Sequence, residues 1–170
     1  CSEVIPYSNK KEDVLAAQKV DILLNRLFIE PLLGKGYPRL EEFPFLEKLE
    51  LHNKAWKYTE RLQFDMDFIG IQNYFPVVVK YNQFIPIVNA SEVKAITRKV
   101  PHTAMGWEIN ADSFYHIIKR FWNYGGVKEI IISESGAAFK DKLVNGVVND
   151  TDRIQYFQQY LGALLKAKKE

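Results

Sequence analysis

Lys128-Glu-Ile-Ile-Ile-Ser-Glu-Ser-Gly136 is the stretch that decides the fold. Its short and almost continuously apolar run is typical of a strand buried on both faces of a parallel sheet. The residues before it predict a helix, because Asn110 can cap its amino end and apolar side chains recur at helical spacing as far as Gly125-Gly126. A helix followed by a buried strand indicates an α/β fold in which helices cover a parallel sheet.

The neighbouring segments continue this pattern on both sides. Downstream, a loop over 136–149 leads to a helix that Asp150 or Thr151 can cap. We expect that helix to pack through one apolar face, which consists of Ile154, Phe157, Leu161 and Leu164. Upstream, Asp67-Phe-Ile-Gly-Ile-Gln-Asn-Tyr-Phe75 ends before a proline and predicts a second buried strand.

Three further segments complete the chain. Residues 11–33 carry apolar side chains at helical spacing on a broad stripe, so we expect a long and mostly buried helix. A polar helical stretch follows around 45–61. The region 77–103 is long and irregular, with β-branched residues that predict a short hairpin, and excursions of this length usually serve as functional loops.

The number of strands indicates that the chain is part of a larger fold. Only two or three strands are visible, and two parallel strands alone would leave unpaired edges. We therefore expect residues 1–170 to form a single fragment of one domain rather than a complete sheet.

The composition excludes several classes of protein. The formal net charge of +2 argues against a nucleic-acid-binding surface, and no apolar run approaches the roughly 18 residues that a membrane span requires. Cys1 is the single cysteine, so no internal disulfide can form, and we expect a reducing compartment and a cytoplasmic location. His52, His102 and His116 lack the spacing of metal ligands, so we expect neither a metal nor a cofactor.

Two candidate site residues lie at the ends of the predicted strands. In α/β barrels, reactive side chains stand where strands end and loops converge. Glu134 follows the isoleucine run, and Tyr74 ends the upstream strand. Two structural alternatives remain open from the residues alone: Glu134 can be a helix-capping or salt-bridged glutamate, and Tyr74 can be an amphipathic packing residue.

Five segments, in order along the chain, resemble motifs of the family 1 glycoside hydrolases. Ile131-Ile-Ser-Glu-Ser-Gly-Ala-Ala-Phe139 is similar to the nucleophile motif I-T-E-N-G-A-A. The other four are Arg26-Leu-Phe-Ile-Glu-Pro-Leu-Leu-Gly-Lys-Gly-Tyr-Pro38, Asp67-Phe-Ile-Gly-Ile-Gln-Asn-Tyr74, Thr103-Ala-Met-Gly-Trp-Glu-Ile109 and Asp152-Arg-Ile154. The resemblance implies a partial (β/α)8 TIM barrel that covers roughly strands six and seven and the surrounding helices.

The resemblance also implies roles for site residues. Glu134 corresponds to the catalytic nucleophile of a β-glucosidase-type enzyme, and Tyr74 corresponds to a tyrosine that donates to it. Gln72 stands where the family usually has asparagine, so its contact with the sugar and nucleophile region is an open expectation. Ser135 replaces the asparagine that usually follows the nucleophile, and Trp107 is expected to be scaffold.

One part of the implied mechanism is missing from the sequence. In the family, the acid/base glutamate belongs to an N-E-P motif, and no such triplet occurs here. Glu30-Pro31 matches a different motif and is predicted to be structural. We therefore expect a retaining β-glycosidase of β-linked glucosides or related saccharides whose fragment alone is inactive and whose partner is the remainder of the barrel, covalent or as a complementary chain. The alternative is a non-catalytic, glycosidase-like carbohydrate-binding or receptor module.

Overall fold

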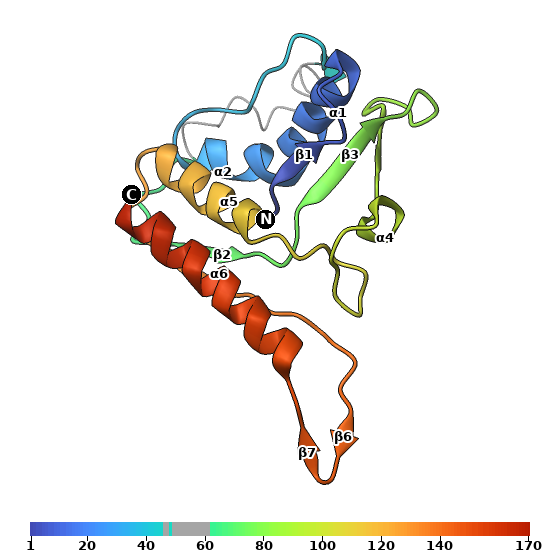
Figure 1. The fold of residues 1–170 in the computed structure, drawn as a ribbon. Coiled ribbons are helices and arrows are strands. Elements are labelled where there is room, and N and C mark those ends of the chain that lie inside the picture. The colour runs from blue at the N-terminus through green and yellow to red at the C-terminus, as the bar shows by residue number, and fades with distance from the viewer. Residues whose placement is uncertain (46–47, 49–61) are drawn as a thin grey trace.

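The computed structural model describes residues 1–45, 48 and 62–170, and Figure 1 shows their arrangement. Most of the helical stretch expected around 45–61, together with His52, lies outside the described residues. In chain order the elements are β1 (Val4–Pro6), α1 (Lys11–Asp21), the π-helical turn η1 (Ile22–Arg26), α2 (Leu27–Leu32), β2 (Ile69–Gln72), β3 (Val77–Tyr81), β4 (Ala90–Glu92), α4 (Ala95–Arg98), α5 (Ala111–Asn123), β5 (Ile130–Glu134), β6 (Leu143–Val144), β7 (Val147–Val148) and α6 (Thr151–Lys169).

Strands β2 and β5 form the parallel pair that the sequence predicts, with α5 in the crossover between them. Asn110 caps α5 as expected, because its Oδ1 accepts a hydrogen bond of 2.9 Å from the Ser113 amide. One core holds this unit together, and it includes Ile71 of β2, Ile117 of α5 and Tyr156 of α6. Burial of this apolar surface is the main force that fixes the two strands against their helices.

A second sheet has the strand order β1-β3-β4. Strands β3 and β4 are antiparallel and form the hairpin expected between 77 and 103. The sequence gives no indication of β1, which is only three residues long and pairs in parallel with β3. Asp13 ties α1 to this sheet, because its carboxylate accepts from the Ser8 hydroxyl at 2.6 Å and from the Tyr81 amide at 2.8 Å.

The prediction of one long, mostly buried helix over 11–33 is wrong in two respects. The helical course is interrupted by η1, whose i→i+5 hydrogen bonding shifts the stripe of apolar side chains. Leu24 and Phe28 are exposed, the latter by 64%. Within the described part of the chain, the packed side of this helix is the one that carries Ala16, Ala17 and Ile22.

The prediction that the isoleucine strand is buried on both faces is also wrong. Alternate side chains of a strand point to opposite faces. Ile130 and Ile132 pack against the core, whereas Ile131 on the other face is 40% exposed. The face that carries Ile131 is therefore open in this chain.

Helix α6 packs through a different stripe from the one expected. Tyr156 and Tyr160 are buried, and of the predicted face only Leu164 packs against the core. Ile154, Phe157 and Leu161 are exposed. The tyrosines are preferred because their rings bury a large apolar area while a hydroxyl keeps a partner: Tyr160 Oη accepts from the Asn110 amide at 3.1 Å.

Two details of the segment before α6 also differ from expectation. The helix begins after Asp150 as predicted, but the Asp150 carboxylate pairs with Arg153 instead of capping the helix. Within the loop expected over 136–149, β6 and β7 form a small hairpin that projects away from the rest of the molecule in Figure 1. In the part of the chain that the structure describes, the helices are too short or too polar to span a membrane.

Candidate active site

Three of the predicted site residues meet at the carboxyl ends of β2 and β5. Glu134 accepts a hydrogen bond of 2.5 Å from the Tyr74 hydroxyl and one of 2.8 Å from Gln72 Nε2. Each donor goes to a different carboxylate oxygen, Oε2 and Oε1 respectively. The contact of Gln72 was an open expectation, and the structure places its longer amide within direct reach of Glu134.

A β-bulge in β5 brings Glu134 to this position. Ile71 pairs with Ile132, but the next residue of β2, Gln72, pairs with Glu134, so Ser133 has no counterpart. A bulge of this kind re-aims the side chains that follow it. Without it, Gln72 would pair with Ser133 and the glutamate would point to the opposite face. The sequence does not reveal the bulge, because Ser133 looks like an ordinary strand residue.

The side chain of Glu134 is exposed and, among the described residues, has no cationic partner. Within the described part of the chain, it belongs to none of the ion pairs that the structure contains. The open structural alternative of a salt-bridged or capping glutamate therefore does not describe it. Both of its hydrogen-bond donors are neutral groups, which orient a carboxylate without cancelling its charge.

The hydrogen bond between Tyr74 and Glu134 also affects the pKa of the tyrosine. The hydrogen bond to Glu134 raises the pKa of the Tyr74 phenol, because a deprotonated phenolate beside the carboxylate would lose that bond and face a like charge. Tyr74 therefore stays a donor at neutral pH. Its ring lies against Trp107, with centroids 5.4 Å apart.

Hydrogen bonds of Asn73 and Cys1 hold the carboxyl end of β2 in place. Asn73 is 1% exposed, and its Nδ2 donates to the Cys1 carbonyl at 3.1 Å. Its amide donates to the Glu134 carbonyl at 3.1 Å, and the Cys1 nitrogen donates to the Gln72 carbonyl at the same distance. Sequence reasoning missed Asn73 and Cys1, although a polar side chain between two strand-end residues is a usable signal for a buried hydrogen-bonding role.

The other polar residues considered from the sequence lie elsewhere. The Ser135 hydroxyl is 3.4 Å from that of Tyr156, in contact with α6. His102 Nδ1 is 2.9 Å from the Val100 carbonyl, and His116 pairs with Glu3. Among the residues that the structure describes, no group of three or more histidine, cysteine, aspartate or glutamate side chains is placed to hold a metal ion.

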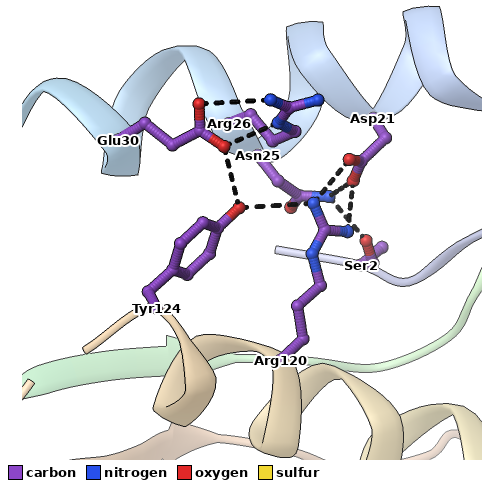
Figure 2. Close-up of polar contacts among 7 residues, drawn as sticks. All are labelled: Ser2, Asp21, Asn25, Arg26, Glu30, Arg120 and Tyr124. Atoms are coloured by element: carbon purple, nitrogen blue, oxygen red, sulfur yellow. Dashed lines mark hydrogen bonds and ion pairs between the residues drawn. The ribbon is translucent and has the colours of Figure 1, made fainter. Parts of the chain in front are cut away.

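Glu30 lies in the polar network of Figure 2, between the first helical segments and α5. It is buried and accepts from Arg26 Nε at 2.6 Å, one helical turn away. The Tyr124 hydroxyl donates to it at 3.4 Å. This arrangement agrees with the structural role that the sequence predicts for Glu30-Pro31.

Comparison with known proteins identifies the wider family. The whole chain, residues 1–170, matches glycosyl hydrolase family 1. It is 33% identical to β-glucosidase A of Thermotoga maritima over 167 residues, which are 97% of this chain and 36% of that protein.

Solved structures agree with this match. The family 1 β-glucosidase of Thermotoga maritima superposes with a TM-score of 0.86 and 31% identity over 99% of this chain and 37% of its own. The same organism's family 1 glycoside hydrolase in complex with a cyclophellitol analogue transition state mimic gives 0.85 and 31%, with the same coverage. The chain thus spans little more than a third of these proteins, and its fold is part of a (β/α)8 barrel. It belongs to glycosyl hydrolase family 1.

Proposed function

We propose that Glu134 is the nucleophile of a retaining β-glycosidase that acts on β-linked glucosides or related saccharides. The observation that carries this proposal is the environment of the Glu134 carboxylate: it is exposed, accepts a hydrogen bond on each oxygen from Tyr74 and Gln72, and has no cationic partner among the described residues. A charged, oriented carboxylate at the end of a barrel strand is what attack on an anomeric carbon requires.

The proposed reaction has two steps. In the first, a Glu134 oxygen bonds to the anomeric carbon while the bond to the leaving oxygen breaks, and a second carboxyl gives that oxygen its proton. In the second, the same carboxyl takes a proton from water, whose oxygen displaces Glu134 from the sugar. The two carboxyl groups of such a pair lie about 5–5.5 Å apart.

The second carboxyl is proposed to come from outside these 170 residues. The sequence contains no N-E-P triplet, and Glu30 is paired with Arg26. We therefore propose that the remainder of a barrel, joined covalently or supplied as a complementary chain, completes the site. The chain alone is expected not to hydrolyse glycosides, because loss of general-acid assistance typically costs roughly 10²–10⁴-fold.

Relatives support the substrate class. The similar protein of Thermotoga maritima is a β-glucosidase, and the related solved structure holds a mimic of the transition state built on a cyclophellitol analogue. We extend this class, a β-linked saccharide, to the site that contains Glu134, and we propose no cofactor for it.

Covalent labelling tests the proposal. A polypeptide that holds this chain together with the rest of the barrel is treated with a 2-deoxy-2-fluoro β-glucoside that has a reactive leaving group. We expect a stable adduct whose peptide map places the sugar on Glu134, and no adduct on E134Q. Hydrolysis without an adduct, or an adduct on another residue, would contradict the assignment, and binding without either would favour the non-catalytic carbohydrate-binding module.

A further inference from the structure

We infer that Trp107 is a positioning residue, whose indole holds the Tyr74 phenol in the orientation from which it donates to Glu134. The sequence suggests only scaffold for Trp107, and the inference rests on the proposed function of Glu134. It adds a third element to the site, because Trp107 comes neither from β2 nor from β5 but from the loop 103–107 before α5.

The aromatic contacts carry the inference. The Trp107 ring lies 5.4 Å from the Tyr74 ring at an interplanar angle of 50°, and 4.9 Å from the Phe75 ring at 24°. Both distances are within the range in which aromatic pairs attract one another. Tyr74 and Phe75 lie beyond the end of β2, so strand pairing does not fix their side chains. Packing against the indole of Trp107 therefore fixes these two side chains.

The loop that carries Trp107 is itself rigidly held. The Thr103 amide donates to the Trp107 carbonyl at 2.8 Å, and the Thr103 hydroxyl accepts from the amides of Met105 and Trp107 at 3.3 Å each. Thr103 is buried, and Gly106 has a φ of +77°, which a residue with a Cβ rarely adopts.

A further contact joins this loop to the segment that follows β5. The Ala104 amide donates to the Ala138 carbonyl at 2.8 Å, in the segment that follows β5. The next residue after Trp107, Glu108, is buried and paired with Arg98. The indole is thus fixed relative to Tyr74 on one side and to the Glu134 segment on the other, which is the geometry that a positioning residue needs.

Loss of the Tyr74 contact would halve the number of hydrogen-bond donors to the Glu134 carboxylate. Glu134 has two, Tyr74 and Gln72. If the phenol turns away, one carboxylate oxygen loses its donor, and the nucleophile is held by a single amide. A rotation of this kind changes the rate of attack more than the affinity for the sugar, so we expect an effect on kcat rather than on KM.

The test uses carbon-13 NMR of the chain labelled at tyrosine Cζ, which responds to hydrogen bonding of the phenol and needs no catalysis. The Tyr74 signal, identified with Y74F, is recorded in the wild type to mark the bonded position and in E134L, whose side chain has no acceptor, to mark the unbonded position. We expect W107L to move the signal most of the way to the E134L position, and W107F, which keeps an aromatic ring, to leave it near the wild-type position.

Two internal controls keep the test decisive. The signals of Tyr124 and Tyr160, which have other partners, report whether a variant is folded. If W107L unfolds, F75L removes the other stacking partner of Trp107 while the indole stays, and we expect a partial shift of the Tyr74 signal. A folded W107L or F75L whose Tyr74 signal stays at the wild-type position would overturn the inference, whether or not Glu134 proves to be the nucleophile.

A kinetic measurement addresses the rate directly. In the polypeptide that carries the whole barrel, we expect W107L to lower kcat roughly tenfold, the scale of one lost hydrogen bond to a charged group. Because W107L and Y74F act on the same bond, the double variant should be little worse than Y74F. Additive losses, or a change confined to KM, would mean that Trp107 contacts the saccharide or its leaving group instead.

Discussion

Glu134 and Glu30 make similar contacts in different electrostatic surroundings. Each accepts a hydrogen bond from a tyrosine hydroxyl, Tyr74 at 2.5 Å in one case and Tyr124 at 3.4 Å in the other. Glu30 is buried and also paired with Arg26, whereas the second donor to Glu134 is the neutral amide of Gln72. The presence of a neighbouring cation, rather than the number of hydrogen bonds, separates the two glutamates.

Around Glu30, each carboxylate of the polar network is paired with an arginine. In Figure 2, Arg120 of α5 reaches Asp21 with two nitrogens, at 2.6 and 2.5 Å. Asn25 of the π-helical turn donates to Asp21 at 2.8 Å and to the Ser2 carbonyl at 2.9 Å. This network joins elements that are far apart in sequence, and each acid in it has a cation. It stabilises the fold and leaves no carboxylate available for attack.

The largest effect is expected from E134Q. In the polypeptide that carries both carboxyl groups, removal of the proposed nucleophile should lower kcat by on the order of 10⁴–10⁶-fold. E30Q serves as the matched control, with activity close to wild type. Steady-state hydrolysis of an aryl β-glucoside measures both. If E30Q were as inactive as E134Q while still folded, the distinction between the two glutamates would fail.

The next effect concerns stability. R120M leaves Asp21 without its cation at a largely buried position, and we expect a loss of about 2 kcal/mol in the free energy of unfolding, between the values for exposed and fully buried pairs. K128M removes an exposed pair with Asp65 and should cost much less. Urea denaturation of the chain measures both changes. Equal losses would show that the network in Figure 2 adds nothing beyond surface pairing.

Local sequence patterns predict several of the elements that form the site. The strand with Glu134, the helix capped by Asn110 and the hairpin between 77 and 103 follow from local patterns and are confirmed. The contact of Tyr74 with Glu134 rested on a family resemblance, and the geometry agrees with it.

What the sequence could not predict depends on contacts between distant residues or on register. The bulge at Ser133 is one residue in length and has no compositional signal. The preference of α6 for Tyr156 and Tyr160 arises because their polar hydroxyls find partners, which a pattern of aliphatic residues cannot reveal. Ile131 is exposed because no described segment of this chain covers its face of β5. That depends on which segments surround the strand, and the sequence of the strand itself does not show it.

A smaller effect should distinguish the two tyrosines. Y74F removes a donor to the proposed nucleophile, and we expect kcat to fall roughly 10–100-fold with little change in thermal stability. Y124F removes a long bond within a neutralised network and should leave kcat unchanged. Kinetics and thermal melts of the two variants provide the measurement, and a similar fall in kcat for both would contradict the separation of roles.

The smallest effect is a change in the alkaline behaviour of these phenols. The pKa of Tyr74 is raised above 10.0 chiefly by its hydrogen bond to Glu134, whereas that of Tyr124 is raised chiefly by burial and is opposed by Arg120. E134Q should therefore lower the pKa of Tyr74 clearly, while E30Q should lower that of Tyr124 only slightly. Titration of the tyrosine Cζ signals measures each shift.

The same shifts give a sign for stability against pH. A phenol whose pKa is higher in the folded state than in the unfolded chain keeps its proton while the unfolded chain releases it above pH 10, so the free energy of unfolding falls as pH rises through that window. The contribution is fully present below the unfolded pKa. E134Q removes the main cause for Tyr74, so its alkaline loss of stability should be shallower than that of E30Q. A steeper loss for E134Q would mean that burial, and not the Glu134 carboxylate, raises the pKa of Tyr74. The two tyrosines would then not differ in this respect, and only the two glutamates would distinguish the sites.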